Sequence, residues 1–148
     1  MAGRRTDQPT TAREVWGPAT GKRVWVGGHS TVAKREIEPL LDGASRPAEG
    51  PLDAGFVTPQ SVDEAVYFAS KLRSRVSPAG VIWIIHPTPQ SVHRAAFSGN
   101  PEDLAVELFS RGFTEVGHAT ITNDFASVGF RATAGFDRAN AEVPGQLP

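Results

Sequence analysis

The sequence predicts a single compact domain of the α+β class with about three short helices. Three observations lead to this prediction. The chain has 148 residues, of which 39% are hydrophobic and 21% are charged, and this is enough apolar mass for one core. Its apolar segments are short, and helix-like and strand-like patterns do not alternate regularly. Turn signals that contain many of the 15 glycines and 12 prolines separate these segments.

The first predicted elements are a strand and a helix. Residues 23–29 begin as a strand rich in Val and Trp, and a glycine pair turns the chain so that His29 lies in a loop. Residues 31–41 have apolar side chains at helical spacing, and a proline ends or kinks this helix. Residues 42–54 are rich in Gly, Pro and Ser without a period, so we expect a loop that could act as a lid.

A second strand and helix come next. Residues 56–58 are expected to form a minimal strand. Ser61 and Glu64 match the capping-box motif, which predicts the start of a helix. Apolar residues recur on one face of this helix as far as Val76. Residues 81–85 are a continuous apolar run too short for a helix, so we expect a central strand buried on both faces.

The last third of the chain predicts a helix and a hairpin. Asn100 is a good N-cap for a helix over residues 101–111, and Gly112 ends it. Residues 113–121 and 125–132 contain strand formers on either side of a polar turn. The total is five or six short strands in a mixed arrangement.

These elements place the domain at residues 21–136. Residues 1–20 and 137–148 are polar and broken by Pro and Gly, so we expect two tails, with Trp16 anchoring the first on the domain surface. No apolar run approaches the roughly 18 residues that a membrane helix needs, and no signal peptide is evident. We therefore expect a cytoplasmic protein that does not contact a membrane.

The composition excludes several kinds of chemistry. The net charge of −1 supplies no global positive field, which disfavours nucleic acid as a partner. The absence of Cys removes disulfides and thiolate ligands, and His86 and His93 lack the spacing of a metal site, so we expect no metal. The glycine motifs of nucleotide-binding loops and the serine nucleophile elbow are also absent.

One group of residues, taken in its order along the chain, suggests a chemical function. His29-Ser30-Thr31 follows the first strand, Tyr67-Phe68 lies on the second helix, and Glu107 is a late acid. In this order they resemble ADP-ribosyltransferases, a family that works without a metal. Residues 84–88 and 97–101 are similar to the small bacterial rifamycin-modifying branch, which serves antibiotic resistance, and residues 105–107 are similar to the bacterial toxin branch.

The resemblance implies a fold of small split antiparallel or mixed β-sheets. It implies that NAD is the cofactor, consumed as a substrate, and that ADP-ribose passes to an acceptor that is a small molecule or a protein. The residues that it assigns to NAD binding are His29, Ser30, Thr31, Thr58 and Tyr67. It assigns catalysis to Glu107 together with His29.

Each of these features also has an ordinary structural interpretation. The glycine pair before His29 can be a simple turn, and Tyr67 can be a core residue beside Phe68. Glu107 lies on the polar face of its predicted helix, where a solvated carboxylate is common, and Asp124 is a competing late acid. A non-catalytic module that retains the fold and binds or interacts without the chemistry is therefore the alternative hypothesis.

Overall fold

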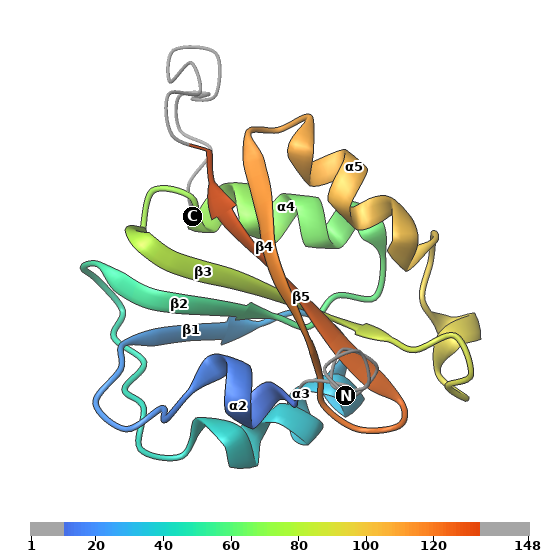
Figure 1. Ribbon diagram of the computed structural model, residues 1–148, viewed down its shortest axis with the longest axis horizontal. Coiled ribbons are helices and arrows are strands. Elements are labelled where there is room, and N and C mark those ends of the chain that lie inside the picture. Colours follow the sequence, from blue (N-terminus) through green and yellow to red (C-terminus); the bar gives the residue numbers. More distant parts are fainter. Residues whose placement is uncertain (1–10, 134–148) are drawn as a thin grey trace, which may run out of the picture.

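Five strands form one mixed sheet in the order β1-β2-β3-β5-β4 (Figure 1). The structure is a computed structural model, and it describes residues 11–133. The strands are β1 (Val24–Gly27), β2 (Leu52–Val57), β3 (Val76–Pro87), β4 (Phe113–Thr120) and β5 (Phe125–Ala132). The first three are parallel, whereas β5 pairs antiparallel with both β3 and β4. The α+β class is confirmed, but one continuous sheet stands where split sheets were expected.

Helices cover both faces of this sheet. The α-helices are α2 (Ala12–Trp16), α3 (Thr31–Ile37), α4 (Val62–Leu72) and α5 (Leu104–Phe109), and the short 3-10 helices are η1 (Glu38–Leu41), η2 (Arg94–Ala96) and η3 (Pro101–Asp103). Helices α4 and α5 pack on one face, and α2 and α3 pack on the other (Figure 1). Within residues 11–133, no helix is long and apolar enough to cross a membrane. The predicted tail 137–148 and residues 1–10 lie outside the described residues, and the domain boundaries stay a prediction.

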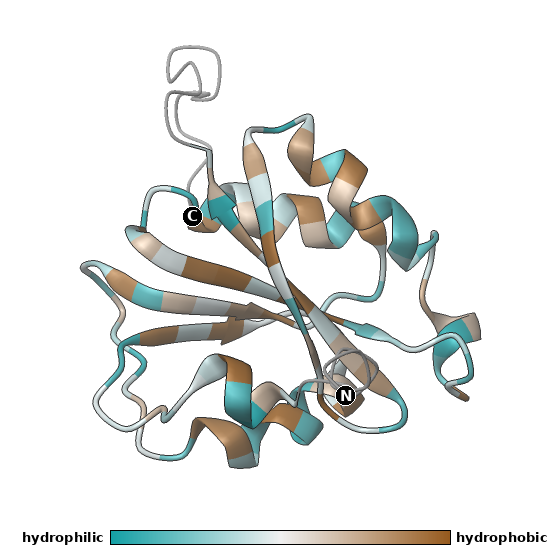
Figure 2. Ribbon diagram, viewed as in Figure 1, coloured by the Kyte–Doolittle hydropathy of each residue, from teal (hydrophilic) through white to brown (hydrophobic). Residues whose placement is uncertain are grey.

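The apolar run in β3 joins the cores of both faces. Ile82 and Ile84 pack with the α4 and α5 side, whereas Trp83 and Ile85 pack with the α2 and α3 side. All four are buried. The prediction of a central strand buried on both faces is confirmed, and Figure 2 shows the apolar residues concentrated in this strand and its neighbours.

Local signals set the starts of the helices better than their ends. Ser61 Oγ accepts a hydrogen bond from the Glu64 amide at 2.9 Å, as a helix cap requires. Helix α4 ends at Leu72, however, and Val76 belongs to β3, where it pairs with Leu52 of β2. Pairing with a distant strand overrides the helical pattern of residues 73–76.

The predicted lid over residues 42–54 is wrong, because side chains tie this segment to the sheet. The guanidinium of Arg23 donates to two of its carbonyl oxygens, at 2.8 and 2.9 Å, and that of Arg75 donates to the Gly50 carbonyl at 2.9 Å. The last three residues of the segment already belong to β2.

The chain reverses its direction across the sheet between β1 and β2. The Val24 amide donates to the Ser45 carbonyl at 2.8 Å, on the edge of β1 that faces away from β2. Helix α3 therefore leads outward from β1, whereas α4, on the opposite face, leads from β2 to β3. Two connections that run in opposite directions across the sheet have the same hand when they lie on opposite faces of it. Both connections can therefore be right-handed, as crossovers between parallel strands are. Such a reversal is a topological switch point, and ligands of open α/β sheets bind beside it, outside the carboxyl ends of the strands.

Candidate functional site

The loops at this switch point contain four of the predicted site residues. Ser30 caps α3, its Oγ accepting from the Ala33 amide at 3.3 Å, and Thr31 is the exposed first residue of that helix. His29 is exposed in the loop before them, and Thr58 follows β2 and is fully buried. The carboxyl edge of the sheet is therefore the first place to look for a ligand.

Backbone contacts join the two loops directly. The Thr58 amide donates to the Gly27 carbonyl at 2.8 Å, and the Ser30 amide donates to the Thr58 carbonyl at 2.9 Å. Gly28 has a φ of +139°, and a Cβ there would lie 2.2 Å from the Thr58 carbonyl oxygen. The glycine allows the chain to approach itself, so the interpretation of the glycine pair as a turn is confirmed.

Glu64 closes the same edge with its carboxylate. The Glu64 side chain is only 11% exposed, and it accepts from the amides of His29, at 3.1 Å, and Gln60. Its Oε2 also contacts His29 Nδ1. In the predicted capping box Glu64 would bind the amide of Ser61; it binds the preceding amide instead and reaches across to the loop after β1. Its reach to His29, 35 residues away, has no signal in the local pattern.

An aromatic cluster lies beside this edge. Phe68 contacts the rings of Trp25, Tyr67 and His29, with centroid distances of 5.3, 5.2 and 6.4 Å. Tyr67 is 54% exposed, so the interpretation of it as a core residue is wrong. Lys71 Nζ lies 5.0 Å from the centroid of the Tyr67 ring. The structure thus brings His29 and Tyr67 against the same residue.

The two late acids are not joined to this cluster. Glu107 is exposed on α5, and its carboxylate makes no hydrogen bond or ion pair with His29 or Tyr67 in the described chain. Asp124 lies in the turn between β4 and β5, where its carbonyl accepts from the Thr88 amide at 2.9 Å. That turn confirms the predicted hairpin.

One histidine near the carboxyl end of β3 has an altered acidity. Burial lowers the pKa of His86 below its usual value of 6.5, and the positive charges of His118 and Arg94 act in the same direction. A hydrogen-bond contact of His86 Nδ1 with the Pro87 carbonyl, at 3.1 Å, opposes the shift. The neutral imidazole is therefore the favoured form in the folded protein.

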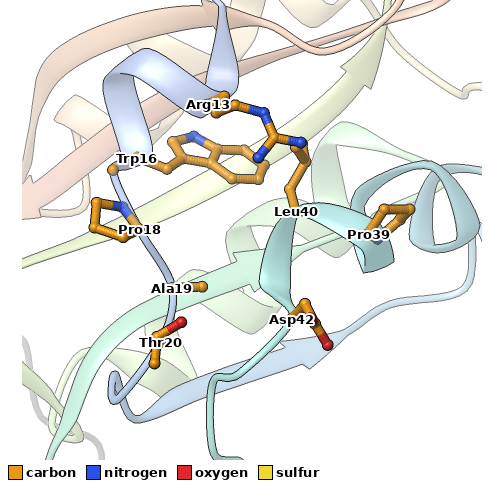
Figure 3. A pocket seen from close by; sticks show the side chains of 9 residues that line it. Arg13, Trp16, Pro18, Ala19, Thr20, Pro39, Leu40 and Asp42 are labelled. Atoms are coloured by element: carbon orange, nitrogen blue, oxygen red, sulfur yellow. The ribbon is translucent and has the colours of Figure 1, made fainter.

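A cavity lies at the opposite, amino end of the strands. It has a volume of about 460 Å³ between α2 and η1 (Figure 3). Its lining residues are Arg13, Trp16, Gly17, Pro18, Ala19, Thr20, Pro39, Leu40 and Asp42. A second, smaller pocket of about 200 Å³ shares Trp16 and Leu40 with it and is lined by the core residues Ala54, Phe56 and Trp83. Sequence reasoning missed this cavity.

Trp16 lines both pockets. It is 8% exposed, and its ring lies 4.7 Å from that of Phe56 and 5.9 Å from that of Trp83, centroid to centroid. Its indole Nε1 is buried and has no hydrogen-bond partner among the described residues. A buried donor without a partner costs about 1–3 kcal/mol. The signal that could have found this site is the capping-box spelling of Thr11 and Glu14, which starts α2 and directs Trp16 inward.

Comparison with known proteins shows a likeness of fold only. No protein-family model and no curated protein matches the chain. Among solved structures, the Methanococcus jannaschii fibrillarin pre-rRNA processing protein is similar with a TM-score of 0.50 and 10% identity, over 79% of this chain and 70% of its own. The N,N-8-amino-8-demethyl-D-riboflavin dimethyltransferase RosA from Streptomyces davawensis (TM-score 0.48, 14% identity) and the mitomycin 7-O-methyltransferase MmcR (0.48, 13%) each align with 74% of this chain. The chain spans only 42% and 41% of their lengths.

The resemblance to ADP-ribosyltransferases is wrong. The solved structure that shares this fold at a TM-score of 0.50 is a fibrillarin pre-rRNA processing protein, not an ADP-ribosyltransferase. The predictions that depended on this resemblance are therefore wrong as well. They are NAD as the cofactor, NAD with an acceptor as the partners, ADP-ribosyl transfer as the activity, and the toxin and antibiotic-resistance classes. The physical reason is the sheet: its three adjacent parallel strands require helical crossovers, which split antiparallel sheets do not contain. The short motif at residues 29–31 is the loop after the first of these strands.

Proposed function

We propose that this chain is a small-molecule-binding domain built on a Rossmann-like sheet of the methyltransferase type, and that its ligand lies in the cavity at the amino edge. The observation that carries the proposal is a cavity of about 460 Å³ in which the Trp16 ring, Leu40 and prolines lie beside the charged side chains of Arg13 and Asp42.

The fold of the methyltransferases named above implies S-adenosylmethionine at the carboxyl edge, and the residues there do not fit it. Gly28 is packed against the Thr58 backbone, so no gap separates the two loops. The amides of His29 and Gln60, which would face the polar groups of a ligand, already donate to Glu64. We therefore derive no methyl transfer from this edge.

The predicted site residues take other roles in this proposal. Ser30 and Thr58 hold the two loops together, through the α3 cap and through hydrogen bonds to the loop after β1. His29 contacts the closing carboxylate of Glu64, and Tyr67 is an exposed neighbour of Phe68. We propose no catalytic role for Glu107, whose carboxylate is solvated on α5.

The amino edge has the properties of a ligand site. Its volume of about 460 Å³ lies within the range of about 300–1,000 Å³ that is usual for small-molecule pockets. Prolines, Leu40 and the Trp16 ring supply apolar walls, and Arg13 and Asp42 supply charge at its opening (Figure 3). Charged groups at an opening and apolar groups in its wall together orient a bound small molecule.

The test is a pair of titrations followed in ¹H–¹⁵N correlation spectra of the whole chain. We expect S-adenosylmethionine and S-adenosylhomocysteine at millimolar concentration to leave the amides of residues 28–31, 58, 60 and 61 unshifted. A panel of small ring-bearing molecules, namely benzyl alcohol, benzoate, benzylamine and phenylalanine, should shift the indole signal of Trp16, identified by its loss in Trp16→Phe.

Two results would overturn the proposal. Saturable binding of S-adenosylmethionine at residues 28–31 and 58–61 would show that Glu64 is displaced and that the ligand site lies at the carboxyl edge. A Trp16 signal that no member of the panel moves would show that the cavity binds no small molecule.

A further inference from the structure

Helix α2 covers an aromatic site on the sheet with its own side chain. The Trp16 ring lies against the rings of Phe56 on β2 and Trp83 on β3, at centroid distances of 4.7 and 5.9 Å. The smaller pocket, of about 200 Å³, is lined by the same three residues, so space remains beside the indole. The indole therefore lies in an aromatic site that it does not fill.

The two pockets at this end of the sheet share a wall that belongs mainly to α2. The residues that line both pockets are Trp16, Gly17, Ala19 and Leu40. All but Leu40 lie on α2 or in the segment directly after it, and Figure 3 shows this segment along one side of the opening. Movement of α2 away from the sheet would therefore join the two pockets and uncover Phe56 and Trp83.

Few contacts hold α2 in this position. It has five residues, of which Ala12 and Trp16 are buried, and so short a helix is not stable without tertiary contacts. Among the described residues, no ion pair or side-chain hydrogen bond joins it to the sheet or to α3; Thr11 pairs with Thr120 of β4, and Lys22 Nζ donates to the Trp16 carbonyl at 3.1 Å. The buried indole N–H lacks a partner that water would supply if α2 moved away.

The segment after α2 has the backbone of a hinge. Gly17 has φ +73° and ψ −173°, a conformation that is essentially restricted to glycine. Four residues later the chain is fixed, because the Gly21 amide donates to the Gly43 carbonyl at 3.1 Å. Rotations within residues 17–19 are therefore enough to move α2 while β1 stays in place.

We propose that α2 is a hinged cover of the cavity and that Trp16 competes with the ligand for one site. The ligand carries an aromatic ring, which binds against Phe56 and Trp83 while α2 is lifted and Trp16 is displaced. This inference rests on the proposed function and adds the regulation of the same site. The measured affinity is then the affinity of the open form reduced by the fraction of molecules that are open.

A reversible lock tests the cover directly. The chain has no Cys, so Thr11→Cys combined with Thr120→Cys introduces a single possible disulfide. Paired residues on neighbouring strands lie at a spacing that a disulfide spans. The ring-bearing panel of benzyl alcohol, benzoate, benzylamine and phenylalanine is titrated against both redox forms and followed by the Trp16 indole signal. Every member that binds should bind the oxidised form about tenfold or more weakly than the reduced form, because binding requires opening.

Two glycine variants supply the second arm without a disulfide. Gly17→Ala strains the closed backbone, and lifting α2 relieves this strain, so panel members should bind about tenfold more tightly than to the parent. Gly21→Ala is the matched control: its φ is also positive, at +83°, but its bond to Gly43 does not depend on α2, so the affinity should not change. If Gly17→Ala binds no more tightly than Gly21→Ala, the inference is wrong.

Hydrogen exchange measures the opening itself. The amides of Val15 and Gly17 donate to the carbonyls of Thr11 and Arg13, at 3.0 and 3.2 Å. In the parent they should exchange about a hundredfold faster than the protected amides of β3, through an opening that leaves the sheet folded. Exchange at the same rate as β3 would show that α2 leaves only when the whole protein unfolds, and no cover would exist.

The outcomes separate the two proposals. If panel members bind the oxidised and reduced forms equally, α2 is not a cover, and the cavity remains a binding site in the form that the structure shows. If no member moves the Trp16 signal in either form or in the glycine variants, the proposed function fails and this inference fails with it.

Discussion

The two ends of the parallel strands differ in how completely the protein satisfies its own polar groups. At the carboxyl end, Glu64 accepts from two loop amides, and the Gly28 loop packs against Thr58. At the amino end, Trp16 lines a cavity of about 460 Å³, and its buried indole N–H has no partner among the described residues. The end that topology marks as the ligand site is closed by the chain itself, and the other end is open.

Strand topology and the satisfaction of polar groups are separate criteria for locating a ligand site in this fold. The switch-point rule describes where loops leave room for a ligand and present free amides. Here the carboxylate of Glu64 accepts hydrogen bonds from those amides, and Gly28, which has no side chain, allows the two loops to pack together. A site assignment for this fold therefore needs the hydrogen-bond partners of the loop amides as well as the order of the strands.

The largest effect should come from opening the contact between the loops at the carboxyl end. We expect Gly28→Ala to destabilise the protein by about 3 kcal/mol or more, because the new Cβ meets the Thr58 carbonyl and the backbone has a positive φ. Urea unfolding followed by circular dichroism measures this change. Gly21→Ala is the matched control: it has a φ of +83° and nothing within 4 Å of the new Cβ, so it should lose only about 1 kcal/mol. Equal losses would mean that the loops are not in tight contact.

Removing the closing carboxylate should have the second largest effect. Glu64→Ala leaves the amides of His29 and Gln60 without their acceptor, and we expect a loss of about 1–3 kcal/mol in the free energy of unfolding. Asp63→Ala, at the neighbouring exposed position in the first turn of α4, removes a charge without a partner and should cost less than about 1 kcal/mol. Similar values for the two variants would show that Glu64 acts only on the helix dipole.

Local patterns predicted the elements whose signals are self-contained. The buried run 82–85 had to be a central strand, and the caps Ser61 and Asn100 are where helical turns begin. The order and direction of the strands could not be predicted in this way. They depend on pairings such as Leu52 with Val76, which no local spacing specifies and which convert a predicted helix end into a strand.

The same distinction explains the sites. The pattern placed His29 in a loop after the first strand, and this is confirmed, but its partner Glu64 is 35 residues away. The short His-x-Thr spelling fits any polar loop that caps a helix after a strand, so it could not distinguish one fold from another. Trp16 was assigned to a tail because its environment comes from Phe56 and Trp83, on strands far along the chain.

A third prediction uses pH to probe the carboxyl end of β3. The folded protein favours neutral His86, so its pKa is lower in the folded than in the unfolded state. As the pH falls below about 6.5, the unfolded state binds this proton more readily, and the free energy of unfolding decreases. Urea midpoints at pH 7, 6 and 5 should fall more steeply for the parent than for His86→Gln, in which the other three histidines are unchanged. Parallel slopes would contradict the lowered pKa of His86.

The smallest change is expected at the amino end, from Trp16→Phe. This substitution removes the indole N–H that has no partner, a gain that offsets the packing lost with the smaller ring, so the free energy of unfolding should change by no more than about 1 kcal/mol. Urea unfolding of this variant beside Glu64→Ala compares the loss of a polar group at the two ends directly. A loss at residue 16 as large as that at residue 64 would mean that the indole N–H is already satisfied.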